Sequence, residues 1–415
     1  MAPRLVVTLP SGLDGDAARA FARRIRARGA AILELRTDLH PPASVDPAAL
    51  AEHLDLLVAE RGARLPAPWI AAASVVDREE AHAEGGRGRP LVSHHAARPL
   101  PTSQALALWQ KLRPPPEALV KHVEPLGNPP SGTRLLATQR ALQGEFGPDR
   151  VTVLATGPLA LPFRAVLSRA NALEYVAMSA DWSSAPGQRL LDDAVREARA
   201  SSPRLLRLGI VGSRIQGSRS PRIHPQPFDR IDLPEDAALG DLLDALLPFY
   251  AGLAVTSPFK RAAAEHVRSK LKAVNTLVRR PDGWEAHNTD VEGARAALEA
   301  LAAKQVTLLG SGGAAVALGL AARALGVELR AVRRGELGET PVSGAVIWTW
   351  PAHLPAPAHL RFERAARVAI IAYGSPAQAI AKEISQRGGL PLRLGPRWLI
   401  AQARRQRELW ESAGL

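Results

Sequence analysis

The sequence contains no cysteine and no long apolar segment. Without cysteine the chain has no disulfide framework, no thiolate nucleophile and no zinc-finger site, which fits an expected cytoplasmic location. No apolar run approaches the roughly 20 residues that a membrane span requires, so we expect no membrane partner. Residues 1–16 predict a strand followed by a turn, and they lack the apolar core and cleavage site of a signal peptide.

Tyrosine is also scarce, although the net charge of +13 raises the question of a nucleic-acid partner. The arginines are scattered through alanine-rich helical segments, and only three tyrosines could stack on bases. The sequence therefore disfavours nucleic-acid binding. Excess positive charge suits small anionic substrates instead, and we expect no metal centre.

Lysine is rare as well, since only seven of the 53 basic residues are lysines. An arginine stays charged in a protein site, whereas a lysine can lose its proton and act as a base or form an imine. Most lysines are nevertheless solvated surface charges. The motifs around each lysine must therefore decide which of them have a chemical role.

Short strand-like segments alternate with alanine-rich helical segments, which predicts an α/β protein of two or three domains. In the first half, strands at residues 4–10, 30–38 and 68–76 and a helix from about Asp46 to Arg61 predict a (β/α)8-type barrel. The pattern restarts at residue 207, so we expect a boundary near Pro203. The predicted domains are 1–203, 204–294 and 295–415, the last with C-terminal helices that return to the second.

A glycine-rich turn follows the strand predicted at residues 305–309. Gly310, Gly312 and Gly313 open a helix there, so backbone N–H groups and the helix N-terminus can face a pyrophosphate. About 20 residues beyond the first glycine, where an NAD enzyme carries an acid for the ribose, this chain has Arg333 and Arg334. Arginine there favours a 2′-phosphate and hence NADP. The alternative is a glycine turn with two surface arginines.

The second half carries five further motifs in a fixed order: GSRSPRIHPQPF, GLAVTSPFK, LKAVNTLV, HNTDVEG and GPRWLIAQA. With these motifs, residues 207–415 resemble shikimate dehydrogenase, an α/β substrate domain followed by a Rossmann-like NADP-binding domain. The resemblance implies that Lys260 and Asp290 form the catalytic pair. Hydride transfer to a ketone develops negative charge on oxygen, and a lysine beside a carboxylate can donate and then recover a proton. An ordinary salt bridge is the alternative.

The same resemblance implies contacts to substrate and cofactor. The substrate would be bound by Ser218, Ser220, Thr256, Asn275, Tyr373 and Gln402. NADP would be bound by Gly310, Gly312, Gly313, Ala314, Arg333, Arg334 and Gly395. Three positions depart from the family pattern: Ala254 replaces an asparagine, Trp398 replaces a methionine near the nicotinamide, and Arg333 replaces an asparagine. Residues 345–355 match the family's loop over the cofactor only loosely.

The first half carries the motifs LELRTD, VSHHAARPLPT, LVKHVEP, GPLALPFR and SSAPGQ. With them it resembles type I 3-dehydroquinate dehydratase, a (β/α)8 barrel that acts through a lysine imine. The resemblance implies that Lys121 forms the imine and that His95 is the base, with His94 as its rival and a structural histidine as the alternative. The substrate would be bound by Glu34, Arg36, Arg164, Ser184 and Gln188.

Two features of this half depart from the family. A substrate-binding arginine is expected in residues 68–86, but Ala73 or Ser74 stands at its position, and Arg78 could replace it only by reaching across. Between Gly86 and Ser93 about two βα elements of the family are missing. We therefore expect a shortened barrel that closes differently or opens.

These motifs favour a bifunctional enzyme that dehydrates 3-dehydroquinate and reduces the product, 3-dehydroshikimate, with NADPH. A second hypothesis is a shikimate dehydrogenase with an inactive barrel as scaffold. A third is a non-catalytic sensor of quinate or shikimate. A sensor is expected to lose catalytic lysines before substrate-binding residues, and the first half shows the reverse. The sequence leaves the oligomeric state open.

Overall fold

The computed structural model describes residues 3–79, 88–199, 206–224, 228–350 and 354–414. The chain divides into two compact units. Unit 1 comprises Met1–Pro221 and Gln226–Phe249, and unit 2 comprises Arg222–Pro225 and Tyr250–Leu415. The predicted boundary near Pro203 lies outside the described residues, and the three predicted domains stay predictions. Within the described ranges, no helix is long and apolar enough to cross a membrane.

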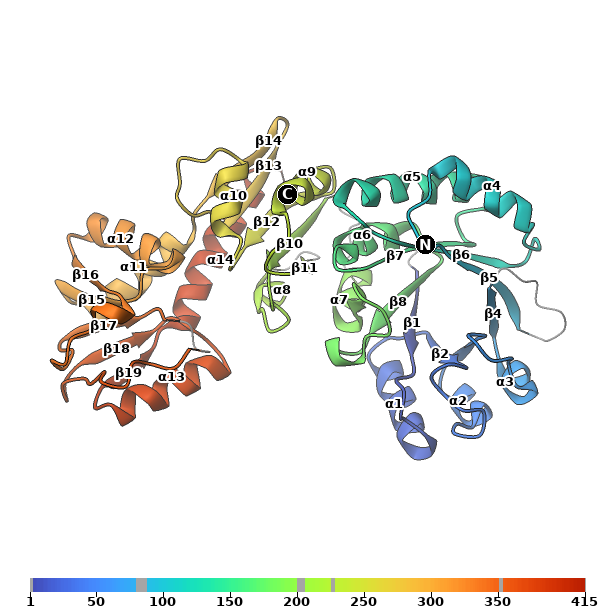
Figure 1. Ribbon diagram of the computed structural model, residues 1–415, viewed down its shortest axis with the longest axis horizontal. Helices are drawn as coiled ribbons and strands as arrows, with labels where there is room; N and C mark the ends of the chain where they lie inside the picture. Colours follow the sequence, from blue (N-terminus) through green and yellow to red (C-terminus); the bar gives the residue numbers. More distant parts are fainter. Residues whose placement is uncertain (1–2, 80–87, 200–205, 225–227, 351–353, 415) are drawn as a thin grey trace. The chain divides into compact units, whose positions relative to one another are not determined.

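Unit 1 is built on a parallel sheet (Figure 1). Among the described residues this sheet has nine strands in the order β7-β6-β5-β4-β3-β2-β1-β8-β9. The strands are β1 Arg4–Thr8, β2 Ile32–Arg36, β3 Asp55–Ala59, β4 Val75–Glu79, β5 Arg89–His95, β6 Leu119–Pro125, β7 Val151–Thr156, β8 Leu173–Ala177 and β9 Arg189–Leu190. The helices are α1 Gly15–Ala27, α2 Pro47–Ala51, α3 Ala67–Ala72, α4 Thr102–Leu112, α5 Pro129–Phe146, α6 Ala160–Leu167, η1 Ser168–Ala170, η2 Ala180–Trp182 and α7 Leu191–Ala198. Strands β1 to β8 follow the circular order of a (β/α)8 barrel, as predicted.

Residues 46–76 differ from the sequence expectation. The predicted helix from Asp46 to Arg61 is wrong, because α2 ends at Ala51 and β3 follows it, and the strand predicted at 68–76 begins with α3. Leucine and alanine suggested a helix, yet Leu56, Leu57, Val58 and Ala59 form strand β3 and are fully buried within the sheet. The expected loss of barrel strands is also wrong, because β1 to β8 are all present in the sheet of unit 1. The shortening falls on residues 80–88, which alone connect β4 to β5, where a parallel crossover usually takes a dozen or more residues.

Side chains alternate between the two faces of each strand, and this alternation places the polar residues of the barrel. The inner apolar layer contains Leu119 and Val123 of β6, so Lys121 between them also points inward. On β4, Val75 belongs to the same layer, and Asp77 and Glu79 follow it at the same two-residue spacing. The apolar layer thus fills the lower barrel, and polar inward side chains gather at the carboxyl ends.

Among the described residues, the seam between β7 and β8 has no strand ladder and is closed by one backbone hydrogen bond and by side chains. Near the amino ends, the backbone N–H of Ala172 donates to the Val151 carbonyl at 2.9 Å, and the Asn171 amide bonds both backbone groups of Val153 at 2.8 and 2.9 Å. Further up, Arg164 Nη2 donates to the Tyr175 carbonyl at 2.9 Å. At the carboxyl end, β8 pairs with β9. The outer edge of β8 is therefore occupied along most of its length.

The chain continues with a mixed α/β segment. In unit 1, β10 (Arg207–Gly212) pairs in parallel with β11 (Phe228–Asp232), followed by α9 (Leu239–Leu246). In unit 2, antiparallel pairing joins β12 (Tyr250–Val255), β13 (Thr276–Arg280) and β14 (Gly283–His287). The helices here are α8 Ser220–Ile223, α10 Lys260–His266 and α11 Asp290–Leu301.

The last part of unit 2 is a parallel sheet in the order β16-β15-β17-β18-β19. The elements are β15 Gln305–Leu309, α12 Gly313–Leu325, β16 Glu328–Val332, η3 Arg334–Glu336, β17 Ala345–Trp348, β18 Arg367–Ile370, α13 Ser375–Gln386, β19 Leu390–Arg393 and α14 Gly395–Glu411. This order is the doubly wound pattern whose crevice lies at the carboxyl ends of β15 and β17. The Rossmann-like prediction is confirmed. Helix α14 returns to β13, where Trp410 Nε1 donates to the Leu277 carbonyl at 3.1 Å.

Candidate functional site

The barrel of unit 1 has a cavity of about 240 Å³ at the carboxyl ends of its strands. It is lined by all seven residues that the sequence predicts for this half: Glu34, Arg36, His95, Lys121, Arg164, Ser184 and Gln188. His94 is not among the described residues that line the cavity. Side chains alternate along β5, so the His94 ring points away from the cavity and stacks on His122, with ring centroids 5.7 Å apart. The placement supports His95 over its rival.

Lys121 is buried in this cavity, with 3% of the residue exposed. Its Nζ lies 2.5 Å from Oδ2 of Asp77, 3.4 Å from the hydroxyl of Tyr175 and 4.8 Å from the centre of that ring. Arg61 Nη2 reaches the same Asp77 oxygen at 2.7 Å. Burial would raise the pKa of Asp77, but the charges of Lys121 and Arg61 hold it below its ordinary value. Asp77 is therefore ionised and fixes the position of the Lys121 amine.

His95 is held by Glu79. The Glu79 carboxylate lies 3.0 Å from Nδ1 of His95 and accepts from its backbone N–H at 3.2 Å. Partial burial and the nearby charges of Lys121 and Arg61 lower the pKa of His95 to about 4. The ring is therefore neutral near pH 7. Because Glu79 accepts a hydrogen bond from Nδ1, Nε2 keeps a lone pair that can accept a proton.

Arg61 is an arginine in this cavity, although the family resemblance predicted one within residues 68–86. It lines the cavity just after β3. Ala73 and Ser74 lie before β4 at the opposite end of that strand, and Arg78 turns toward Glu60, with 3.6 Å from Nε to Oε2. Because residues 46–61 were predicted to form a helix, the sequence did not indicate that Arg61 follows a barrel strand. The period-two spacing of Asp77 and Glu79 was a signal that could have identified both acids.

The loop before β9 covers the cavity through a chain of hydrogen bonds. Gln188 Nε2 donates to the Ser184 hydroxyl at 3.1 Å, which lies 3.1 Å from the Thr8 hydroxyl. Thr8 in turn donates to Oε2 of Glu34 at 2.6 Å. The loop is thus linked to β1 and β2 by three residues predicted to contact the substrate, Gln188, Ser184 and Glu34, together with Thr8.

Three arginines, Arg36, Arg61 and Arg164, line this cavity. The Arg36 guanidinium bonds both oxygens of Asp38 at 2.7 and 3.0 Å, and this bonding lowers the pKa of Asp38. Arg164 is buried, and burial lowers the pKa of its guanidinium to about 10, so it remains charged at neutral pH. A small anionic molecule would therefore find fixed cations in the cavity.

Unit 2 has a cavity of about 860 Å³ that joins the predicted catalytic lysine to the glycine-rich turn. Lys260 begins α10 and forms an ion pair with Asp290, the first residue of α11. The predicted residues that line this cavity are Thr256, Lys260, Gly310, Gly312, Gly313, Ala314, Arg333 and Arg334. The predicted catalytic lysine and the glycine-rich turn thus face one cavity, and Asp290 is linked to it by the ion pair with Lys260.

The glycine-rich turn has room only for glycine at its first position. Gly310 has φ +130°, and a Cβ there would lie 2.3 Å from the Thr349 hydroxyl oxygen. Arg334 lies over the Trp350 ring at 5.4 Å, and its buried Nε has no partner among the described residues. Arg333 has a side chain 71% exposed. The turn and an incompletely bonded arginine together fit a phosphorylated dinucleotide.

Five predicted residues of unit 2 are not among the described residues that line this cavity: Asn275, Asp290, Tyr373, Gly395 and Gln402. The Asn275 amide bonds Thr289, accepting from its N–H at 2.7 Å and donating to its hydroxyl at 3.1 Å. A Cβ on Gly395 would lie 2.0 Å from the Ala372 carbonyl oxygen, which explains glycine there by packing. Their proposed contacts to substrate or cofactor stay predictions.

Ser218 and Ser220 belong to unit 1. The Ser218 hydroxyl accepts from the Ser220 backbone N–H at 3.3 Å, and Ser220 is buried at the start of α8. In unit 2, Trp398 packs its ring against Gly293, where a Cβ would lie 2.7 Å away. No cluster of metal-binding side chains occurs in the part of the chain that the structure describes.

The chain is similar to curated shikimate dehydrogenases, although no protein-family model matches it. Shikimate dehydrogenase (NADP(+)) of Anaeromyxobacter sp. (strain K) is 36% identical over 146 residues, covering 31% of this chain and 52% of that protein. The bifunctional 3-dehydroquinate dehydratase/shikimate dehydrogenase of Arabidopsis thaliana is 29% identical over 181 residues, covering 35% of this chain and 30% of that protein. The chain thus spans about half the length of the curated shikimate dehydrogenases that it matches.

Among solved structures, dehydroquinate dehydratase and shikimate dehydrogenase from S. pombe is similar over 99% of this chain and 96% of that one. The two chains are 17% identical, with a TM-score of 0.38. A TM-score this low does not establish a common fold. The arrangement of strands described above therefore rests on this chain's own structure.

Proposed function

We propose that this chain is a bifunctional enzyme that dehydrates 3-dehydroquinate and reduces the resulting 3-dehydroshikimate with NADPH. The observation that carries the proposal is the convergence of predicted residues in two cavities, with Lys121 and His95 in one and Lys260 beside the glycine-rich turn in the other. Similarity to curated NADP-dependent shikimate dehydrogenases supports the second reaction.

In the barrel, Lys121 would act as the nucleophile. Its amine, after losing a proton, attacks the ketone carbon of 3-dehydroquinate, and water leaves as the imine forms. The protonated imine withdraws electrons, so neutral His95 can take a proton from the adjacent carbon, and the substrate hydroxyl then leaves as water. Hydrolysis of the imine releases 3-dehydroshikimate and frees Lys121. Glu79 keeps the His95 ring oriented throughout.

In unit 2, Lys260 would protonate the oxygen that becomes negative on reduction. Its ion pair with Asp290 holds the ammonium group in the cavity and allows it to recover a proton from solvent. NADPH would be held by the turn from Gly310 to Ala314 and by Arg334, and when bound it supplies the hydride. Ser218 and Ser220 would bind the substrate carboxylate.

One observation favours the alternative in which the barrel is only a scaffold. The ion pair with Asp77 stabilises the ammonium form of Lys121, and an ammonium group cannot attack a ketone. If substrate binding does not release this proton, the chain reduces 3-dehydroshikimate and leaves 3-dehydroquinate unchanged.

A two-stage assay separates these possibilities. Purified protein is given 3-dehydroquinate without NADPH, and the enone absorbance of 3-dehydroshikimate should rise. When NADPH is then added, the enone absorbance and the absorbance of NADPH should both fall. Lys121→Arg should abolish the first stage and preserve reduction of added 3-dehydroshikimate. Lys111→Arg, at an exposed lysine of α4, is the matched control and should preserve both stages. Absence of the first stage alone supports the scaffold alternative, and absence of both refutes the proposed function.

A further inference from the structure

The loop that carries Ser218 and Ser220 is tied to the last helix of the barrel, entirely within unit 1. Helix α7 presents Asp193 and Arg196 three residues apart, which places both side chains on one face. The Asp193 side chain is only 12% exposed. Its two carboxylate oxygens bind different arginines, since Oδ1 accepts from Arg196 at 3.3 Å and Oδ2 pairs with Arg230 of β11.

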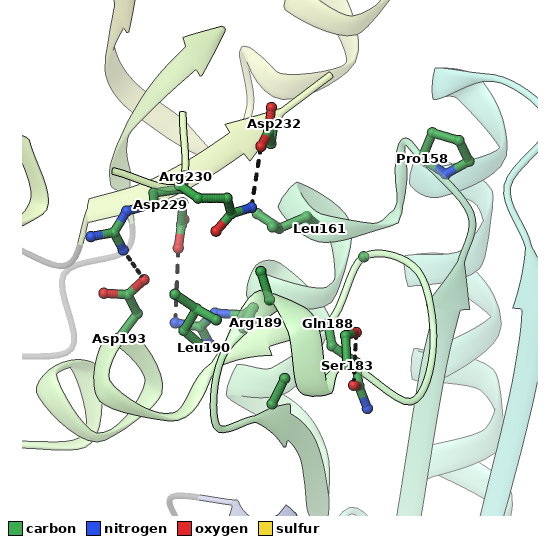
Figure 2. A pocket seen from close by; sticks show the side chains of 14 residues that line it. Pro158, Leu161, Ser183, Gln188, Arg189, Leu190, Asp193, Asp229, Arg230 and Asp232 are labelled. Atoms are coloured by element: carbon green, nitrogen blue, oxygen red, sulfur yellow. Dashed lines mark hydrogen bonds and ion pairs between the residues drawn. The ribbon is translucent and has the colours of Figure 1, made fainter. Parts of the chain in front are cut away.

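Each of these arginines also donates to the backbone of the serine loop. Arg230 Nη2 donates to the Ser218 carbonyl at 3.3 Å, and Arg196 Nη1 donates to the Pro221 carbonyl at 2.9 Å. One carboxylate therefore orients two guanidinium groups, which hold the chain on both sides of Ser220. We name Asp193, Arg196 and Arg230 the α7 clamp. Figure 2 shows Asp193 facing the Arg230 guanidinium.

On the side of the clamp, the serine loop faces a cavity and is held there by polar contacts. A cavity of about 270 Å³ lies beside the clamp and is lined by Asp193, Arg230, the barrel loop residue Gln188, and Gln216 of the serine loop (Figure 2). Apolar packing cannot fix the loop where it faces a cavity. By contrast, α7 itself is anchored, because Glu197 bonds the buried Arg207 of β10 at 2.7 Å. The clamp thus joins a fixed helix to a loop that is otherwise held by its buried Ile215 and by a hydrogen bond from Gln216 to Asp232 at 3.2 Å.

We propose that Asp193 is a positioning residue for the loop of unit 1 that carries Ser218 and Ser220, so that the barrel's last helix sets the position of these two predicted carboxylate-binding serines. This inference rests on the proposed function, in which Ser218 and Ser220 bind the substrate carboxylate. Loss of the Asp193 charge would free both guanidinium groups to turn away. The two carbonyls would then lose their donors, and the serine hydroxyls would no longer be held in place for the carboxylate.

The test uses the full chain and the Asp193→Asn variant, which keeps the shape of the side chain and removes its charge. In the oxidation of shikimate with NADP+, KM for shikimate should rise about tenfold, the effect of losing one charge-assisted hydrogen bond. kcat, KM for NADP+ and the dehydration of 3-dehydroquinate should stay within about twofold. Asp192→Asn, its exposed neighbour on the same helix, is the matched control and should change none of these values. Asp193→Glu should restore part of the affinity because it keeps the charge.

A second measurement does not depend on activity. Hydrogen exchange followed by mass spectrometry should show faster exchange in residues 213–221 of Asp193→Asn and unchanged exchange in β1 and in Asp192→Asn. If Asp193→Asn does not fold, Arg196→Met removes one arm of the clamp at a half-exposed position and should give a smaller change of the same kind.

Unchanged exchange and unchanged KM for shikimate in folded Asp193→Asn would overturn the proposal. Faster exchange with unchanged KM would overturn the link between the clamp and the substrate. If the unaltered protein neither binds nor oxidises shikimate, the proposed function has failed, and faster exchange in the variant would then show that the clamp holds this loop without serving a dehydrogenase.

Discussion

Replacing Glu197 by glutamine should lower the free energy of unfolding of unit 1 by roughly 3 kcal/mol. The Glu197 carboxylate accepts from Arg189 at 2.5 Å and from Arg207 at 2.7 Å, and both guanidinium groups are buried. Burial would raise the pKa of Glu197, but these two arginines lower it to about 2 from an ordinary value of 4.5. That difference corresponds to roughly 3 kcal/mol in favour of the carboxylate in the folded chain.

The effect should depend on pH. Because the pKa of Glu197 in the folded chain lies below its value in the unfolded chain, the contribution is fully present above about pH 4.5 and is lost as the pH falls toward 2. The unaltered protein and Glu197→Gln should therefore differ most near neutral pH. Their stabilities should converge as Glu197 becomes protonated, because a protonated glutamate and a glutamine are both neutral.

Urea unfolding followed by pulsed hydrogen exchange and mass spectrometry reports unit 1 separately from unit 2. With a urea dependence of about 3 kcal/mol per molar, the midpoint for β10 and β11 should fall by about 1 M at pH 7. Glu145→Gln, at an exposed position of α5, is the matched control and should change stability by less than about 0.5 kcal/mol. A midpoint shift no larger than the control, or one that is the same at pH 7 and pH 3, would refute the reasoning.

Three further outcomes are expected. Borohydride added during turnover with 3-dehydroquinate should attach the ligand to Lys121, as peptide mass spectrometry would show, and an adduct on any other lysine contradicts the assignment. kcat/KM for dehydration should stay level down to about pH 5 and fall below about pH 4 as His95 is protonated, whereas a fall centred near pH 6.5 would mean that burial and nearby charges do not depress its pKa. Steady-state kinetics should show that Arg334→Ala raises KM for NADPH about tenfold and leaves KM for NADH unchanged, because only NADPH carries the 2′-phosphate; an equal rise for both would contradict that role.

The sequence predicted the chemistry of the barrel better than its strands. Lys121 and His95 lie in motifs, and the alternation of apolar neighbours along β5 and β6 is enough to turn both of them inward. By contrast, β3 could not be recognised, because its leucines and alanine suit a helix as well as a buried strand. Because β3 was predicted as part of a helix, the sequence did not indicate that Arg61 lies at the end of a strand, where barrel residues form the site.

Other parts of the sites depend on contacts between distant residues. Asp77 meets Lys121 only because β4 and β6 lie on either side of β5, and no local pattern indicates this pair. The α7 clamp joins Asp193 to Arg230 across a boundary where the sequence suggested separate domains. Motifs therefore predicted the reacting groups, whereas the charges that hold them required the folded structure.

The seam of the barrel has a consequence for the behaviour of the protein in concentrated solution. A sheet that is not closed by a ladder has two edge strands, and the unpaired backbone of an edge strand can pair with another molecule and start aggregation. Here the outer edge of β8 is already occupied, by Ala172 and Asn171 at one end, Arg164 in the middle and β9 at the other end. A neighbouring molecule would have to displace all three to add a strand, so this barrel can forgo a complete ladder without exposing β8 to self-association.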